Sequence, residues 1–139
     1  MGTLNTGTIK VTTIQDAAGA DSSTPNQIQQ GRAKAWCNFN GTGTPAYRDS
    51  FGFNTGTGVI DHGLGDYTVT LSPAMPTANY AVVFGWNSNS VTTVPYFVAI
   101  KGTGSAHTDK TTTTLRVIYA GTANISTDAF EINITIFGD

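Results

Sequence analysis

Charged residues are scarce in this 139-residue chain, where Asp, Glu, Lys and Arg together make up 12%. An ordinary soluble domain carries roughly 25%. The only glutamate is Glu131, and the formal net charge is −2. So few cations exclude a basic nucleic-acid binder. Strong helix formers are also few, which excludes a helical bundle or a coiled coil.

Cysteine and long apolar runs are nearly absent as well. Cys37 is the only cysteine, so a disulfide framework within the chain is excluded. No uninterrupted apolar run approaches the ~20 residues that cross a bilayer, and we expect no membrane insertion. The first five residues also lack the basic and apolar regions of a signal peptide.

Uncharged polar residues take the place of the missing charges, with 24 Thr, 16 Gly and 10 Asn. Thr, Val, Ile, Tyr and Phe, which suit strands, are common. Hydrophobic residues make up 39% of the chain, which is enough to build a core. The length fits one domain comfortably. These features favour an all-β domain with a surface of low charge.

The first 31 residues differ from the rest. A short alternating run at 9–14 gives way to 15–31, which is rich in Ala, Ser, Gln and Asp. Pro25 predicts a helical turn near 26–30, with Ser23 or Thr24 as the cap and the proline at the first helical position. We interpret 1–31 as a connector that leads into a domain at 32–139, or as an arm packed on a neighbour.

From residue 33 onward, alternating segments are separated by turns rich in Gly, Pro and Asn. No connection is long or helical enough for the crossovers of a parallel sheet. The pattern predicts an all-β fold: an antiparallel β-sandwich, jelly-roll-like, with about eight or nine strands. In the last strand, one face is predicted to carry Phe130, Ile132, Ile134 and Ile136. The expected strands are 33–39, 47–53, 59–60, 66–71, 79–86, 94–101, 111–120 and 129–137.

Two of these segments, 80–86 and 94–100, are apolar on both alternating faces. A two-layer sandwich buries one face of each sheet, so the second face needs another cover. That cover is either the N-terminal connector or another subunit. The low charge also suits an interface, since interface cores are depleted of charge. We therefore expect a homo-oligomer.

Several segments, in this order, resemble the C-terminal receptor-binding domain of bacteriophage and prophage tail-fibre proteins. The resemblance covers most of 8–86 and fades after Trp86. Cys37, His62 and Leu64 depart from the family pattern. The segments that carry the resemblance are the lead-in 9–19, Gly31-Arg32-Ala33-Lys34-Ala35-Trp36-Cys37-Asn38-Phe39-Asn40-Gly41-Thr42-Gly43-Thr44, Arg48-Asp49-Ser50-Phe51-Gly52-Phe53, Gly65-Asp66-Tyr67-Thr68-Val69-Thr70 and Ala74-Met75-Pro76-Thr77-Ala78-Asn79-Tyr80-Ala81-Val82.

The resemblance implies a trimeric β-sandwich that ends its chain and contacts the bacterial surface. Its expected partners are two further copies, other tail-fibre segments, and a bacterial surface glycan or outer-membrane receptor. Its expected location is the virion tail fibre, after synthesis in the host cytoplasm. A lone free Cys37 suits that reducing compartment, and its position on an apolar face predicts a small buried hydrophobe.

Aromatic residues beside polar loops suit carbohydrate binding, because a sugar ring stacks on an aromatic plane while amides bind its hydroxyls. Trp86 with Asn87 and Asn89 is the leading candidate for a surface contact. Tyr96, which begins the next strand, and Tyr119 with Asn124 near another loop are further candidates. The alternative for Trp86 is that it closes the end of the sandwich or packs at a subunit interface. Trp36 is expected to pack against another apolar layer or a neighbour.

Catalysis would require carboxylates, and Asp61 and Asp66 flank a Gly-rich loop. A glycosidase needs two carboxyl groups, one with a raised pKa. Asp beside such turns more often caps backbone N–H groups, and both residues suit that role. His62 and His107 lie in separate loops without the spacing of a metal site. We expect no enzyme, cofactor or metal. The alternatives are a structural trimeric connector and a polysaccharide depolymerase.

Overall fold

A computed structural model describes residues 7, 10–15, 17–19, 22–87, 95–102, 109–121 and 127–138. The chain divides into two compact units, Met1–Arg32 and Ala33–Asp139. In the first unit, strands β1 (Ile14–Gln15) and β2 (Ser22–Ser23) pair antiparallel and precede helix α1 (Pro25–Gly31). None of the described elements is a helix long and apolar enough to span a membrane.

Helix α1 begins with a reciprocal cap. The Thr24 side chain accepts a hydrogen bond from the Gln27 N–H at 3.2 Å, and the Gln27 side chain accepts one from the Thr24 N–H at 2.8 Å. Pro25 occupies the first turn, where its missing N–H costs no helical hydrogen bond. The predicted helical turn is confirmed, and its cap is Thr24 rather than Ser23.

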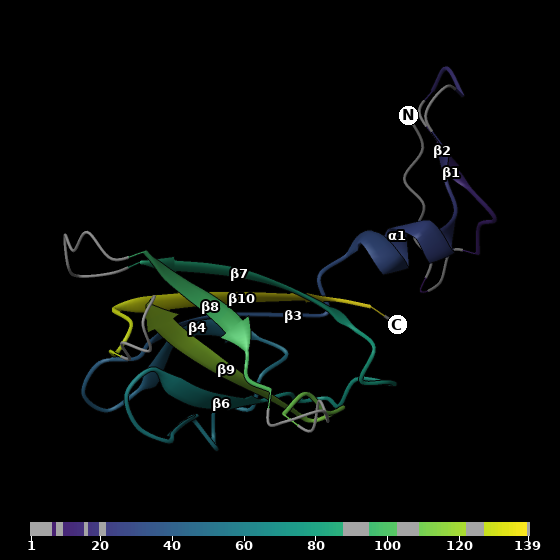
Figure 1. Cartoon of the computed structure of the whole chain (residues 1–139). Coiled ribbons are helices and arrows are strands. Elements are labelled where there is room, and N and C mark those ends of the chain that lie inside the picture. Colours follow the sequence, from purple (N-terminus) through teal and green to yellow (C-terminus); the bar gives the residue numbers. More distant parts are fainter. Residues whose placement is uncertain are drawn as a thin grey trace. The chain divides into compact units, whose positions relative to one another are not determined.

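The second unit is a sandwich of antiparallel sheets, as predicted (Figure 1). Its described residues form eight strands in two four-stranded sheets. The first sheet has the order β4-β3-β10-β7 and the second has the order β5-β6-β9-β8. The strands are β3 (Ala35–Asn40), β4 (Ala46–Phe51), β5 (Val59–Asp61), β6 (Asp66–Thr70), β7 (Ala81–Asn87), β8 (Tyr96–Ile100), β9 (Thr114–Gly121) and β10 (Glu131–Phe137).

The core lies between the two sheets and follows the alternation of the sequence. Residues at every second position of β3, β6, β9 and β10 are buried. Cys37 is 2% exposed, so the prediction of a small buried hydrophobe is confirmed. The largest fully buried side chains are Tyr67, Tyr119, Phe39, Leu115, Ile132, Ile134, Ile136, Val69 and Val117.

The core prediction was wrong at one residue of the last strand. Phe130 precedes β10 and is 39% exposed, whereas Ile132, Ile134 and Ile136 are fully buried. The guanidinium carbon of Arg48 lies 4.9 Å from the centre of the Phe130 ring. A cation over the ring face stabilises this partly exposed position, which alternation alone does not reveal.

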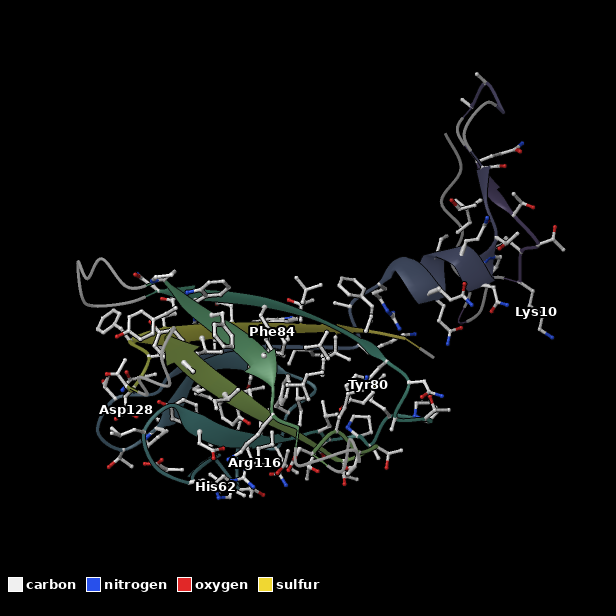
Figure 2. The ribbon with its side chains drawn as sticks, in the orientation of Figure 1. Lys10, His62, Tyr80, Phe84, Arg116 and Asp128 are labelled. Carbon is white, nitrogen blue, oxygen red and sulfur yellow. The ribbon has the colours of Figure 1, made fainter. Side chains whose placement is uncertain are left out.

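At one end of the sandwich, the odd-numbered strands finish and the even-numbered strands start. Strands β3, β5, β7 and β9 end there, and β4, β6, β8 and β10 begin there. The strand pairing establishes this arrangement, together with three hydrogen bonds: Gly41 N–H to Ala129, Gly65 N–H to Asp128, and the Tyr67 hydroxyl to Gly41. The chain enters the sandwich at the opposite end, just before β3. We call the end opposite that entry the distal end. In Figure 2, Asp128 marks the distal end and Tyr80 the other.

The outer faces of the two sheets carry different groups of side chains. On β4-β3-β10-β7, register aligns Phe51, Trp36, Thr135 and Val83 in one row across the strands. Phe51 is 57% exposed, Trp36 38% and Val83 56%. We call this the apolar row. The outer face of the other sheet instead carries an ion-paired cluster around Asp66. The exposed apolar face predicted for 80–86 is therefore present at Val83.

Candidate functional site

A buried polar network holds the turns at the distal end together. The Tyr67 hydroxyl lies 3.1 Å from the Gly41 carbonyl oxygen and 3.0 Å from Asp128 Oδ1. Asp128 Oδ1 also accepts a hydrogen bond from the Gly65 N–H at 3.1 Å. The Gly41 N–H donates to the Ala129 carbonyl at 3.0 Å. Three separate turns are thereby fixed to one phenol and one carboxylate.

Burial raises the pKa of Tyr67 well above its usual range, and the neighbouring Asp128 carboxylate raises it further. The phenol therefore stays protonated and serves as a hydrogen-bond donor at every physiological pH. The turns also require glycine at Gly65, which has φ +69°, and a Cβ there would lie 2.2 Å from the Tyr119 carbonyl oxygen. This close packing gives the distal end a rigid base.

Three predicted aromatic residues lie on the inner faces of the sheets toward the distal end. Trp86 pairs with buried Ile132 and is 44% exposed, on edge strand β7. Tyr96 opens edge strand β8 and is half-buried. Its ring stacks on that of Tyr119, with centroids 5.0 Å apart and planes inclined by 14°. Tyr119 is fully buried, so it supports Tyr96 and presents no ring surface to a ligand.

The polar candidates are separated from these aromatic residues. Asn87 pairs with Glu131 and therefore faces the outer side of the sheet, opposite to Trp86. Trp86 and Asn87 thus do not form one contact surface along the strand, although both lie at its distal end. The predicted contacts of Asn89 and Asn124 fall outside the described residues.

The sequence interpretation missed a group beside Asn87 on the outer face. Arg48 pairs with Glu131 at 3.2 Å and donates to the Phe130 carbonyl oxygen at 2.9 Å. Glu131 also accepts a hydrogen bond from Asn133 Nδ2 at 2.8 Å, and Asn38 Nδ2 donates to Asn133 Oδ1 at 2.7 Å. A bulge shifts the register between β3 and β4 at Asn38 and Phe39, beside Arg48. No sequence pattern marks this bulge, so the position of Arg48 could not be predicted.

The two candidate catalytic carboxylates have structural partners. Asp61 Oδ1 accepts a hydrogen bond from the Gly63 N–H at 2.8 Å, which is the predicted turn cap. The corresponding prediction for Asp66 was wrong, because its carboxylate pairs with Arg116 and Lys101. Burial alone would raise the pKa of Asp66, but the hydrogen bonds and charges of these cations outweigh it and lower that pKa. A carboxyl group held ionised is unsuited to the general-acid role.

Of the two histidines, His62 lies among the described residues and His107 does not. His62 lies on the turn between β5 and β6, and its Nε2 is 3.0 Å from the Thr68 hydroxyl. Within the described ranges, no group of three or more His, Cys, Asp or Glu residues is placed to hold a metal ion.

Comparison with known proteins gives one structural likeness. No protein-family model and no curated protein matches the sequence. The fold is similar to the phiAB6 tailspike, solved in complex with three-repeated oligosaccharides of Acinetobacter baumannii surface polysaccharide. The TM-score is 0.51 at 12% sequence identity, over 99% of this chain and 30% of the tailspike chain. The sandwich architecture is therefore one that also occurs in a phage tail protein.

Proposed function

We propose that this chain is a tip domain of a phage tail fibre that binds a saccharide on the bacterial surface. The observation that carries the proposal is the pair Trp86 and Tyr96 toward the distal end. Both belong to edge strands, and the Tyr96 ring is stacked on that of Tyr119. The likeness to an oligosaccharide-bound tailspike and the resemblance of most of 8–86 to tail-fibre sequences support the same function.

The distal end suits this role because it lies opposite the point where the chain enters the sandwich. The connector at 1–31 would join the preceding fibre segment, so the distal end would point toward the host. Trp86 and Tyr96 are the proposed contact residues, with Asn89 and Asn124, and Asn87 would contact the saccharide from the outer side of β7. The buried Tyr119 ring stacks on the Tyr96 ring and holds it in place. The location that follows is the virion, with synthesis in the host cytoplasm.

The proposed assembly is a homotrimer that gains affinity through avidity. One weak saccharide contact per subunit becomes effective when several sites engage one surface together. The scarcity of charge predicts that binding changes little with ionic strength, because few screened ion pairs contribute. An outer-membrane protein is the alternative receptor class.

The test is a bacterial surface oligosaccharide array, followed by solution titration of the best-bound oligosaccharide. We expect Trp86→Ala and Tyr96→Ala each to weaken binding about tenfold or more, which corresponds to about 1.4 kcal/mol. The matched control is Val83→Ala, on the outer face of the same strand as Trp86 and 56% exposed. It should bind like the unaltered chain. Equal losses in all three variants would contradict the proposed contact.

Two outcomes would favour the alternative functions. Absence of selective binding to any oligosaccharide would favour a structural connector that joins tail proteins. Release of reducing sugar ends from a host polysaccharide, abolished by Asp61→Asn or Asp66→Asn, would favour a depolymerase. The ion pairs of Asp66 and the turn-capping role of Asp61 weigh against that chemistry.

A further inference from the structure

Gly85 lies inside strand β7, where neither the backbone nor the packing requires a glycine. Its φ lies outside the left-handed region, so other residues can adopt the same conformation. A Cβ added there would lie 3.5 Å from the Cβ of Asn133, which is an ordinary van der Waals contact. Strand β7 pairs with β10 in unbroken register over all seven of its residues, so Gly85 marks neither a bulge nor a tight bend.

A glycine at this position has a cost in stability. Inside a strand, glycine loses more conformational entropy on folding than other residues and packs no side chain. Such a glycine often marks a place where a ligand or another backbone approaches closely. Apart from the chain neighbours of Gly85, no described backbone atom lies within 4 Å of the added Cβ. The close approach would therefore come from a bound molecule on the outer face of the sheet.

Register places Gly85 at one end of a polar row across the first sheet. The row continues through Asn133 on β10, Asn38 on β3 and Asp49 on β4, and we call it the amide row. Asn38 Nδ2 donates to Asn133 Oδ1 at 2.7 Å, and Asn133 Nδ2 donates to Glu131 Oε1 at 2.8 Å. These bonds hold both amides in place, as a preorganised binding surface requires.

Aromatic side chains stand beside the amide row. Trp36 lies two residues from Asn38 along β3, which is about 7 Å, and it is 38% exposed. Phe51 pairs with Trp36 on the neighbouring strand. Neighbouring strands lie about 4.8 Å apart, so the four positions of the amide row span roughly 14 Å. A short oligosaccharide can lie along the row and rest the apolar face of a ring against Trp36.

The amide row is continuous with the contact already proposed at Asn87. Asn87 follows Gly85 by two residues and therefore lies on the same face of β7. A saccharide chain held by Asn87 at the distal end can thus pass directly over Gly85 to Asn133. Trp86 faces the other side of the sheet and is a separate contact.

The charges beside the row favour a neutral saccharide. Amide groups both donate and accept hydrogen bonds, as hydroxyl groups do, whereas the Asp49 carboxylate only accepts. Arg48 is paired with Glu131, and exposed Asp49 has no ion pair among the described residues. The uncompensated negative charge of Asp49 would repel a sugar that carries a carboxylate or a sulfate.

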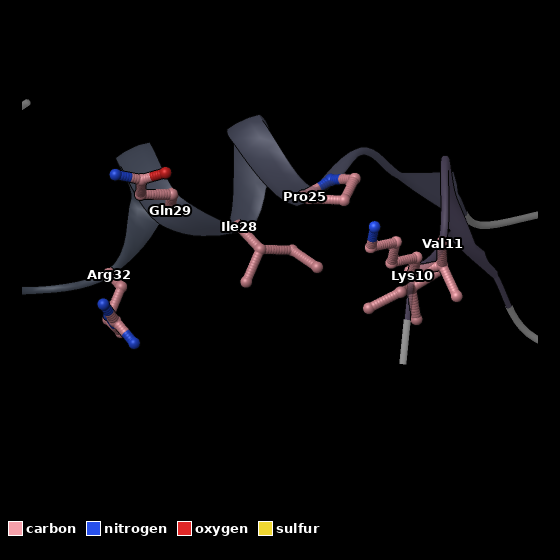
Figure 3. A pocket seen from close by; sticks show the side chains of 7 residues that line it. Lys10, Val11, Pro25, Ile28, Gln29 and Arg32 are labelled. Atoms are coloured by element: carbon pink, nitrogen blue, oxygen red, sulfur yellow. The ribbon is translucent and has the colours of Figure 1, made fainter. Parts of the chain in front are cut away.

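The hollow in the N-terminal unit, shown in Figure 3, lacks this set of groups. Its volume is about 520 Å³, and Val11 and Ile28 are among the residues that line it. Lys10 and Arg32 lie on opposite sides of Ile28. Among its described lining residues, Gln29 is the only amide and none is a carboxylate. The amide row is therefore the better match to a neutral saccharide.

We propose that the amide row, with Trp36 beside it, binds a neutral oligosaccharide that lies over Gly85. The inference rests on the proposed saccharide-binding function and names its ligand class and a second contact on the outer face. Val83 is separated from Trp36 by Thr135 and is assigned no contact.

The first experiment fills the space over Gly85 without removing any side chain. Gly85→Thr should weaken binding of the best-bound neutral oligosaccharide of the array about tenfold or more in solution titration. Its unfolding temperature should stay the same or rise, because threonine suits a strand. The matched control is Val83→Thr, which introduces the same residue on the same face of β7 and should keep the affinity.

A second experiment reads the aromatic contact directly. Trp36 and Trp86 are the only tryptophans, so Trp86→Phe leaves Trp36 as the sole indole fluorophore. Saturation of this variant with the neutral oligosaccharide should change its tryptophan emission. A matched oligosaccharide of the same linkage that carries a uronic acid should bind more weakly to the unaltered chain, and Asp49→Asn should narrow that preference threefold or more.

Four results would overturn the inference. Gly85→Thr could bind like the unaltered chain while Trp86→Ala loses affinity, which would leave the receptor function standing at the distal end alone. The emission of Trp36 could stay unchanged at saturation, or the uronic oligosaccharide could bind more tightly. Gly85→Thr could also change the mass of the chain in light scattering, which would make the outer face a contact between subunits. Absence of oligosaccharide binding by the unaltered chain is a different result, because it removes the proposed function itself.

Discussion

Arg116 holds both carboxylate oxygens of Asp66 across the outer face of the second sheet. Arg116 Nε lies 2.8 Å from Oδ1, and the second guanidinium nitrogen lies 2.9 Å from Oδ2. Lys101 pairs with the same carboxylate. The Asp66 side chain is only 13% exposed, so these bonds are partly shielded from water. Ion pairs of this geometry connect β6, β9 and the residue after β8, and we expect them to stabilise the sandwich.

We predict that Asp66→Asn lowers the free energy of unfolding by about 1.5–3 kcal/mol, the usual range for hydrogen bonds to charged groups. Asp61→Asn is the matched control, because an amide oxygen can still accept the Gly63 N–H. Its effect should stay within about 0.5 kcal/mol. Urea unfolding at neutral pH measures both. Equal losses in the two variants would contradict the structural role assigned to the ion pairs.

The same site predicts a dependence of stability on pH. The pKa of Asp66 is lower in the folded protein, so the unfolded chain binds its proton more readily. The stabilisation is therefore fully present above the unfolded pKa of about 3.9 and is lost as the pH falls through the lower folded value. The stability difference between Asp66→Asn and the unaltered chain should shrink at strongly acidic pH. An unchanged difference would exclude this linkage.

Gly65 provides a test of the packing at the distal end. Its φ of +69° places it in the left-handed region, and an added Cβ would lie 2.2 Å from the Tyr119 carbonyl oxygen. We expect Gly65→Ala to cost more than about 2 kcal/mol of unfolding free energy, from backbone strain and overpacking together.

Gly58 isolates the backbone contribution to that cost. Its φ is +70°, and an added Cβ would meet nothing within 4 Å. Gly58→Ala should therefore cost only the left-handed strain, about 1–2 kcal/mol. Thermal or urea unfolding compares the two variants. If both cost the same, the close approach to Tyr119 does not constrain the turn.

The alternation of apolar residues was sufficient to predict the sandwich. Buried positions in β3, β6, β9 and β10 follow period two, because one face of each sheet packs on the other. The same periodicity misplaced Phe130, because β10 begins only at Glu131. The Arg48 guanidinium from β4 covers the exposed Phe130 ring. Period two describes a regular strand and does not locate its first residue.

The exposure and the partners of the candidate site residues could not be predicted from the sequence. Aromatic residues beside loops could be named as candidates from the sequence, but their exposure depends on packing between the sheets. Tyr119 is fully buried while Tyr96 is half-buried, although both are Tyr near a strand end. Asp66 was assigned a capping role because its partners, Lys101 and Arg116, are 35 and 50 residues away in sequence. Tertiary pairing of this kind leaves no local pattern.

Cys37 gives a chemical test of the core. Burial raises the pKa of its thiol to about 12, and its side chain lies between the sheets. Since the thiolate is the reactive form, a disulfide reagent at mildly alkaline pH should modify this thiol only as fast as the sandwich opens. Addition of urea above the unfolding midpoint should make modification rapid. Rapid modification of the folded chain would contradict the closed core.

Two buried tyrosines make a matched pair that separates the polar network from simple packing. The Tyr67 hydroxyl binds Gly41 and Asp128, whereas the buried Tyr119 hydroxyl has no hydrogen-bond partner among the described residues. We expect Tyr67→Phe to cost about 1–3 kcal/mol, because it leaves buried acceptors unsatisfied. Tyr119→Phe should be neutral or stabilising, since it removes a buried hydroxyl that gains nothing. Urea unfolding decides between them, and a Tyr119→Phe loss as large as that of Tyr67→Phe would show that the Tyr119 hydroxyl has a partner in solution.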